Sequence, residues 1–137
     1  MKVVIDGENS IMGRVASFAA KQALQGKEVA IVNADKVFII GNKKDIIQKF
    51  LTQKQRGKGA KMRGPIIKTN VERLLKRSIR GMMKYKEGRG KIAFKKIRCY
   101  VGVPSEFEKA EKISVHKLEE SKKGLTLKEV SNSLKGI

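Results

Sequence analysis

The chain has 137 residues, of which 40% are hydrophobic and 5% aromatic, and it contains no Trp. This length fits one domain with a core of its own, built mainly from aliphatic side chains and Met. Its 32 Lys and Arg residues outnumber 13 Asp and Glu residues, for a net charge of +19. Such an excess repels itself and favours a polyanionic partner. A Lys-rich surface that served heat stability alone would carry many interleaved Glu residues, so the composition predicts a nucleic-acid-binding protein.

Disulfide, metal-binding, secreted and membrane classes are excluded by features that the chain lacks. The single Cys99 cannot form an internal disulfide, and no group of Cys and His residues has the spacing of a metal site. Near the N-terminus, Asp6 and Glu8 follow three apolar residues, too few for the core of a signal peptide. No apolar run approaches the roughly 20 residues of a membrane span. We therefore expect a cytoplasmic protein with no membrane segment and no metal.

The first forty residues alternate strand and helix patterns. Residues 2–6 (KVVID) and 28–33 (EVAIVN) are short apolar runs typical of buried strands. Between them, residues 11–25 carry an apolar stripe with helical spacing, and Gly26 stands where a left-handed C-terminal cap belongs. The stripe consists of Met12, Val15, Ala16, Ala19, Ala20, Ala23 and Leu24. This order predicts parallel pairing of the two strands through a helical crossover. A third strand at residues 37–40 follows a short turn, and its pairing direction is left open.

A long basic loop is predicted after the second helix. Asn42 is placed to cap that helix, which buries Ile46, Ile47, Phe50 and Leu51. Residues 53–68 (QKQRGKGAKMRGPIIK) then have no apolar period, but contain three glycines and many cations. Loops this long inside a domain are usually functional, and glycine lets the backbone approach phosphates that Lys and Arg neutralise. We expect this loop to be mobile in the free protein and fixed on RNA.

A third helix is predicted to be strongly amphipathic. Thr69 and Glu72 have the spacing of a capping box that opens it. Its apolar stripe comprises Val71, Leu74, Leu75, Ile79, Met82 and Met83, and its opposite face presents Arg73, Lys76, Arg77, Arg80 and Lys84. A row of like charges lowers helix stability, so a solvated face would normally intersperse Glu among them. The row therefore favours phosphate contact, and its nearly pure Lys and Arg content suits backbone binding rather than base reading.

The last third of the chain predicts further short elements. Residues 84–96 form a second basic loop and a short helix, and residues 98–103 (RCYVGV) a final strand. Thr126 and Glu129 form a capping box that predicts a last helix near residues 126–134. Strands that alternate with helices indicate an α/β fold. Charge is uneven along the chain, with a net of +3 over residues 1–53, +15 over 54–98 and +1 over 99–137.

No group of residues indicates catalysis or a nucleotide cofactor. Gly7 follows the first strand, but the G-x-G-x-x-G spacing and the G-x-x-x-x-G-K-[ST] motif are absent. The single His116 is more typical of a surface or packing residue, and Cys99 lies in an apolar strand where an inert, buried thiol is expected. We therefore expect no catalytic residue, no cofactor and no small-molecule substrate.

Aromatic residues near the basic segment have two expected roles. Tyr85 is a candidate for stacking on a base, whereas Phe94 and Tyr100 are expected in the core. The charge pattern also leaves two other classes open: a nonspecific nucleic-acid-binding protein and an RNA-modifying enzyme. Equal binding of duplex DNA and ribosomal RNA would indicate the first class, and saturable cofactor binding the second.

Three segments together resemble the ribosomal protein L13 family of the large subunit: residues 6–17 (DGENSIMGRVAS), 29–44 (VAIVNADKVFIIGNKK) and 77–104 (RSIRGMMKYKEGRGKIAFKKIRCYVGVP). The resemblance covers residues 3–104 and is closest to the archaeal and eukaryotic branch. It implies a three-layer α/β/α domain around a mostly parallel four-stranded sheet, binding to 23S-type rRNA, and a part in subunit assembly. Met82-Met83-Lys84 stands where the family has Met-Leu-Pro, which implies a third helix longer by a turn.

The expected organisation is an α/β domain over residues 1–104, whose basic segment 54–98 binds rRNA, and a C-terminal extension over 105–137. The extension is expected to pack on the domain or on neighbouring large-subunit proteins. The candidate rRNA-binding residues are Lys43, Lys44, Lys54, Arg56, Lys58, Lys61, Arg63, Lys68, Arg73, Lys76, Arg77, Arg80, Lys84, Lys86, Arg89, Lys91, Lys95 and Lys96.

Overall fold

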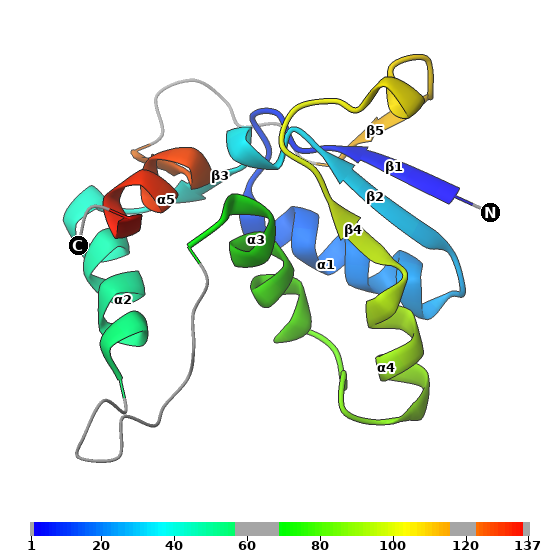
Figure 1. The fold of residues 1–137 in the computed structure, drawn as a ribbon, viewed down its shortest axis with the longest axis horizontal. Helices are drawn as coiled ribbons and strands as arrows, with labels where there is room; N and C mark the ends of the chain where they lie inside the picture. Colours follow the sequence, from blue (N-terminus) through cyan, green and yellow to red (C-terminus); the bar gives the residue numbers. More distant parts are fainter. Residues whose placement is uncertain (1, 57–68, 116–122, 136–137) are drawn as a thin grey trace.

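The computed structural model describes residues 2–56, 69–115 and 123–135, which are arranged as Figure 1 shows. Its strands are β1 (Lys2–Asp6), β2 (Glu28–Val32), β3 (Phe38–Ile40), β4 (Ile97–Cys99), β5 (Lys112–Ser114) and β6 (Gly124–Thr126). Its α-helices are α1 (Met12–Leu24), α2 (Lys43–Gln55), α3 (Val71–Arg80), α4 (Gly88–Lys95) and α5 (Leu127–Lys135), and its 3-10 turns are η1 (Ala34–Lys36) and η2 (Ser105–Phe107). Within these residues, four parallel strands form a sheet in the order β4-β2-β1-β5. The predicted α/β class and the parallel four-stranded sheet are confirmed.

The unit β1-α1-β2 forms the centre of the fold, as its hydrophobic pattern predicts. The two strands pair in parallel, with Val3 opposite Val29 and Ile5 opposite Ile31. The alanines of α1 are buried, and their small side chains allow the helix to lie close to its neighbours. Gly26 has a φ of 92°, the left-handed conformation that glycine adopts at the end of a helix.

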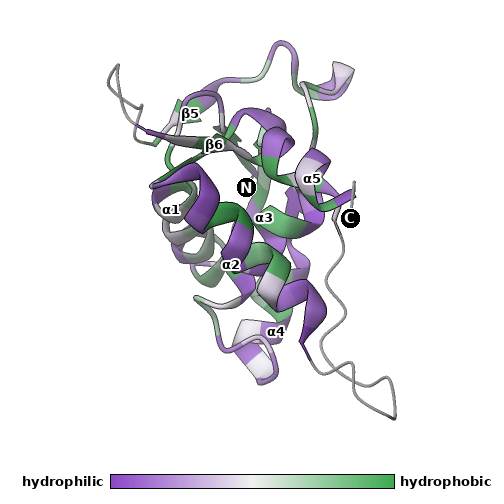
Figure 2. Ribbon diagram, turned by 90° about the vertical axis from the view of Figure 1, so that its left-hand side faces the viewer, coloured by the Kyte–Doolittle hydropathy of each residue, from purple (hydrophilic) through white to green (hydrophobic). Residues whose placement is uncertain are grey.

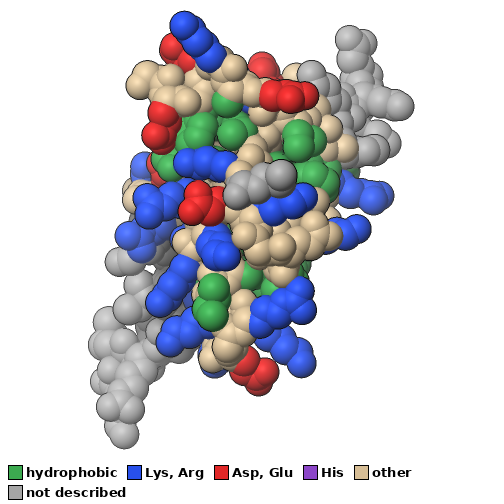
Figure 3. Space-filling model, turned by 90° about the vertical axis from the view of Figure 1, so that its right-hand side faces the viewer, with side chains coloured by type: hydrophobic (Ala, Val, Ile, Leu, Met, Phe, Trp, Pro, Cys, Tyr) green, Lys and Arg blue, Asp and Glu red, His purple; other side chains and the backbone are tan. Residues whose placement is uncertain are grey.

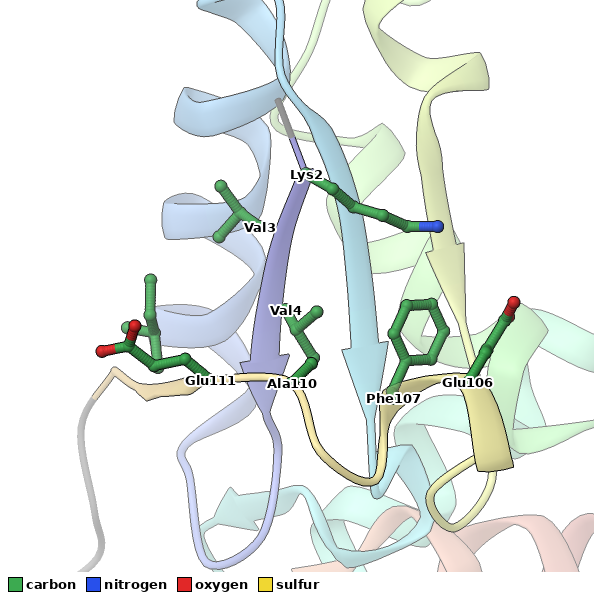
Figure 4. Close-up of a pocket in the computed structure, with 8 residues that line it drawn as sticks. Lys2, Val3, Val4, Glu106, Phe107, Ala110 and Glu111 are labelled. Carbon is green, nitrogen blue, oxygen red and sulfur yellow. The ribbon is translucent and has the colours of Figure 1, made fainter.

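The two faces of the sheet are covered differently. Helices α1, α3 and α4 lie together on one face (Figure 1), where Ile5 and Ile31 join their common core. On the other face, Val4 and Val32 pack against Phe107 of η2. Figure 4 shows the Phe107 ring beside β2, away from α1. In the described residues, the second outer layer of the expected three-layer arrangement is therefore built from η2 and its flanking segments instead of an α-helix.

The pairing and extent of three short strands depend on the folded chain. For residues 37–40 the sequence left the pairing open, and β3 pairs antiparallel with β6 in a separate two-stranded sheet. The fourth strand of the main sheet is β5, which pairs with β1 and comes from the C-terminal extension. The expected strand at residues 98–103 is shorter, because β4 ends at Cys99 and Gly102 turns the chain with a φ of 72°.

Helix boundaries correct three further expectations. Helix α2 continues to Gln55, so residues 53–55 belong to it and not to the predicted loop; residues 57–68 of that loop lie outside the described residues. The predicted capping box at Thr69 is wrong, because Asn70 occupies the N-cap of α3 and makes no side-chain capping bond. The predicted lengthening of α3 is also wrong: the helix ends at Arg80, and turns follow until α4 begins. Met82 therefore leaves the apolar stripe and is 46% exposed.

Two other helix starts agree with the sequence. The Asn42 side chain accepts a hydrogen bond of 3.0 Å from the main-chain N–H of Lys44 and caps α2. The Thr126 hydroxyl accepts one of 3.3 Å from the N–H of Glu129 at the start of α5. The green and purple stretches along α1, α2 and α3 in Figure 2 reflect this amphipathic pattern, with apolar residues turned toward the core. No helix in the described parts of the chain is long and apolar enough to cross a membrane.

Candidate nucleic-acid interface

The candidate cations occupy three places in the fold. Lys43 and Lys44 lie in the first turn of α2, and Lys54 and Arg56 lie at its other end. Helix α3 carries Arg73, Lys76, Arg77 and Arg80; the following turns carry Lys84 and Lys86; and α4 with its C-cap carries Arg89, Lys91, Lys95 and Lys96. The remaining candidates, Lys58, Lys61, Arg63 and Lys68, lie outside the described residues.

Helix α3 turns its cations outward because its apolar side is held in the core. Leu75 and Ile79 are fully buried, and they pack with α1 and β4. Arg73 is exposed on the opposite side, whereas Arg80 at the end of the helix is half-buried. The predicted five-cation row is one residue too long, because Lys84 lies beyond the end of the helix and belongs to the turns.

Aromatic rings connect the cations of α3 with the turns and with α4. Lys76 Nζ lies 4.9 Å from the ring centroid of Phe94, and Arg80 Cζ lies 4.7 Å from that of Tyr85. Lys86 Nζ lies 5.8 Å from the same Tyr85 ring. The two rings are 6.2 Å apart and tilted by 55°, within the range of favourable aromatic contacts. Phe94 packs against the core, as predicted.

Three candidates donate hydrogen bonds to carbonyl groups at or near the ends of helices. Arg89 Nη2 lies 2.7 Å from the carbonyl oxygen of Leu24, the last residue of α1. Lys96 Nζ lies 3.4 Å from the carbonyl oxygen of Gly26, and Lys54 Nζ lies 2.9 Å from that of Leu134 in α5. Carbonyls in the last turn of a helix have no partner within the helix and favour a nearby positive charge. These side chains therefore contribute to the fold itself.

The surface of α3, the turns and α4 is strongly positive. Residues 71–96 contain ten Lys and Arg residues against Glu72 and Glu87. Within the described residues, none of the cations of α3, the turns or α4 forms an ion pair; the ion pair of Lys36 with Glu8, at 3.8 Å, lies elsewhere. Figure 3 shows Lys and Arg side chains over the middle and lower parts of one face, while most carboxylates lie toward its top. The cations of this region thus have no carboxylate partner among the described residues.

Sequence reasoning missed one cation that the fold brings to this region. Lys21 is exposed on α1 and lines a hollow together with Leu24, Met82 and Arg89. It stands in the nearly neutral first third of the chain, so charge counting did not select it. The helical spacing of α1 predicts that Lys21 faces solvent. Its proximity to Arg89 depends on how α1 packs against α4.

Three residues near or among those considered for other chemistry, Gly7, Asp6 and Cys99, have packing roles, and His116 lies outside the described residues. A Cβ atom on Gly7 would lie 2.7 Å from Val37 Cγ2, so this glycine is explained by close packing of the chain. The Asp6 carboxylate accepts hydrogen bonds from the N–H of Glu8 and from the Asn33 side chain, at 3.0 and 3.1 Å. Burial raises the pKa of the Cys99 thiol to about 12, which agrees with the expected inert thiol. In the described part of the chain, no group of three or more His, Cys, Asp and Glu residues could hold a metal ion.

The described residues thus form a parallel α/β core whose surface at α3, the turns and α4 carries cations without ion-pair partners. Residues 1–106 match the model of the family described as ribosomal protein L13. Large ribosomal subunit protein uL13 of Methanocaldococcus jannaschii is 43% identical over 133 residues, which cover 96% of each chain. The corresponding protein of Archaeoglobus fulgidus is 38% identical over 136 residues, covering 96% of this chain and 86% of the relative. That of Methanococcus maripaludis is 46% identical over 105 residues, covering 74% and 76%.

The chain therefore belongs to the ribosomal protein L13 family, as its motifs indicate. It is a structural ribosomal protein and not an enzyme. The three relatives are archaeal, in agreement with the branch that the motifs resemble.

Proposed function

We propose that this chain is a structural constituent of the large subunit of cytoplasmic ribosomes, where it binds 23S-type rRNA and supports subunit assembly beside neighbouring large-subunit proteins. The relatives carry the name of a large-subunit protein. The observation that carries the binding mode is the charge of residues 71–96, where the described cations have no carboxylate partner. These cations lie on α3, on α4 and on the turns between them, which the core holds in place.

The proposed mechanism is neutralisation of phosphates by a rigid, positive surface. Cations in contact with phosphates release the counterions condensed on the RNA, which favours binding at low salt. They also lower the repulsion between RNA segments that fold against each other. Because Lys and Arg dominate and amide side chains are scarce on α3, contacts to the RNA backbone account for binding better than contacts to base edges.

The dependence of rRNA binding on salt tests this mechanism. If about 8–10 cations contact phosphates, the association constant should fall roughly as the seventh to ninth power of the salt concentration. Filter binding or fluorescence anisotropy with fragments of 23S-type rRNA at several salt concentrations measures this slope. A slope near zero would overturn the phosphate-binding model.

Two double variants test whether the salt dependence of rRNA binding arises from the cations of the turns and α4. Lys84→Gln with Lys91→Gln removes two exposed cations from the turns and α4, and should lower the slope by about 2. Lys109→Gln with Lys128→Gln removes two exposed cations from the C-terminal extension, and should leave the slope nearly unchanged. Equal changes in both variants would show that charge acts without regard to position.

Retention on ribosomes separates this function from its alternatives. The ribosomal function predicts that the chain cosediments with large subunits through a high-salt wash. Release in that wash together with equal affinity for duplex DNA would instead indicate a nonspecific nucleic-acid-binding protein. Saturable binding of a cofactor would indicate an RNA-modifying enzyme.

A further inference from the structure

The aromatic pair Tyr85 and Phe94 contacts three of the candidate cations. Arg80 and Lys86 both lie over the Tyr85 ring, at 4.7 and 5.8 Å from its centroid. Lys76 lies over the Phe94 ring at 4.9 Å. Lys76 and Arg80 come from α3, Lys86 comes from the turns that follow, and Phe94 comes from α4. The rings therefore join three parts of the basic surface.

The pair is itself well supported by the core. Both rings are half-buried, and Phe94 packs against the main hydrophobic cluster. Met83, two residues before Tyr85, is buried and holds the turns against the body. Long Lys and Arg side chains lose considerable conformational entropy when they are immobilised. A ring that holds such a side chain before RNA arrives reduces the entropy lost on binding.

We propose that Tyr85 and Phe94 are positioning residues for RNA binding: they hold Arg80, Lys86 and Lys76 on their rings in the orientation that phosphates meet. The inference rests on the proposed function and specifies how its binding surface is organised. It replaces the stacking of Tyr85 on a base, because the Tyr85 ring is contacted by two cations and by Phe94.

Substitutions at Tyr85 test the proposal through RNA affinity and its salt slope. Tyr85→Leu removes the ring without changing any charge, so the affinity for an rRNA fragment should fall about three- to tenfold while the slope stays the same. Tyr85→Phe keeps the ring and should bind like the unmodified chain. Arg80→Gln removes a phosphate contact and should lower the slope by about 1.

The same Tyr85 substitution, made in a chain that lacks two of the cations, distinguishes positioning of those cations from direct contact of Tyr85 with RNA. In a chain that already carries Arg80→Gln and Lys86→Gln, Tyr85 has no cation left to hold, so Tyr85→Leu should change affinity by less than about twofold. An equal loss in both backgrounds would show that Tyr85 contacts RNA itself. No loss in the unmodified background would show that the ring contributes nothing.

A measurement on the protein without RNA tests the contact between Arg80 and the Tyr85 ring directly. The side-chain NMR signals of Arg80 should show a ring-current shift that persists in Tyr85→Phe and disappears in Tyr85→Leu. Absence of that shift in the unmodified chain overturns the inference. If the unmodified chain shows the ring-current shift but no salt-dependent RNA binding, the proposed function fails instead, so the two failures are distinguishable.

Discussion

The guanidinium group of Arg89 lies 2.7 Å from the carbonyl oxygen of Leu24, a residue 65 positions earlier in the chain. Leu24 is the last residue of α1, and Arg89 belongs to the first turn of α4. The hydrogen bond therefore ties the end of the central helix to the basic surface. Arg89, whose charge makes it a candidate for rRNA binding, thus also donates a hydrogen bond to a carbonyl oxygen that has no partner within α1.

Arg89→Gln should destabilise the fold, because the shorter, neutral side chain loses this charged hydrogen bond to the end of α1. The expected loss in the free energy of unfolding is about 1 kcal/mol. Urea unfolding followed by circular dichroism measures it. Lys91→Gln, an exposed cation of the same helix, is the matched control and should change stability by less than about 0.5 kcal/mol. Equal stability of the two variants would contradict a capping role for Arg89.

Two glycines of α4 should respond oppositely to alanine. A Cβ atom on Gly90 would lie 2.0 Å from the carbonyl oxygen of Lys84, whereas one on Gly88 would meet nothing within 4 Å. Gly90→Ala should therefore cost about 1–3 kcal/mol, because the backbone of the preceding turn must move. Gly88→Ala should be neutral or stabilising by up to about 1 kcal/mol. Thermal unfolding of the two variants side by side checks the difference, and similar melting temperatures would contradict the close contact.

Leu127→Ala tests whether the C-terminal extension packs on the rest of the domain. Leu127 is fully buried, and its helix α5 contacts α2 and α3. Its truncation should cost about 2–5 kcal/mol and lower the midpoint of one common unfolding transition. Ile92→Ala is the control, because Ile92 is 60% exposed and its truncation should have little effect. A separate early transition for α5, with the rest of the chain unaffected, would show an independent extension.

Cys99 should be protected from alkylation in the folded protein. Burial raises its thiol pKa from 9.0 to about 12, so the reactive thiolate is scarcer at pH 8, by roughly a thousandfold, than in an exposed cysteine. Labelling by iodoacetamide, followed by mass spectrometry, should be slow in buffer and fast in denaturant. The folded rate should rise as the pH approaches the raised pKa. Equal rates in buffer and denaturant at pH 8 would show that the thiol is not buried.

The local patterns of this chain were sufficient to predict most of its elements. The stripe from Met12 to Leu24 and the apolar runs of β1 and β2 specify a strand-helix-strand unit, since helical and extended periodicities differ. The spacing of Thr126 and Glu129 likewise predicted the start of α5, because a cap depends on residues three positions apart. The clustering of positive charge at residues 54–98 predicts a nucleic-acid partner.

Pairings between distant segments were decided only by the tertiary structure. A strand of three residues, such as β5 or β3, carries too little pattern to show which edge it joins, and packing of the whole chain placed β5 beside β1 and β3 beside β6. The same holds for the cations. Sequence alone determined that this protein concentrates its positive charge in one segment. The fold determined that Arg89 meets Leu24 and that Arg80 lies on the Tyr85 ring, because the direction of a long side chain depends on neighbours that only folding brings near.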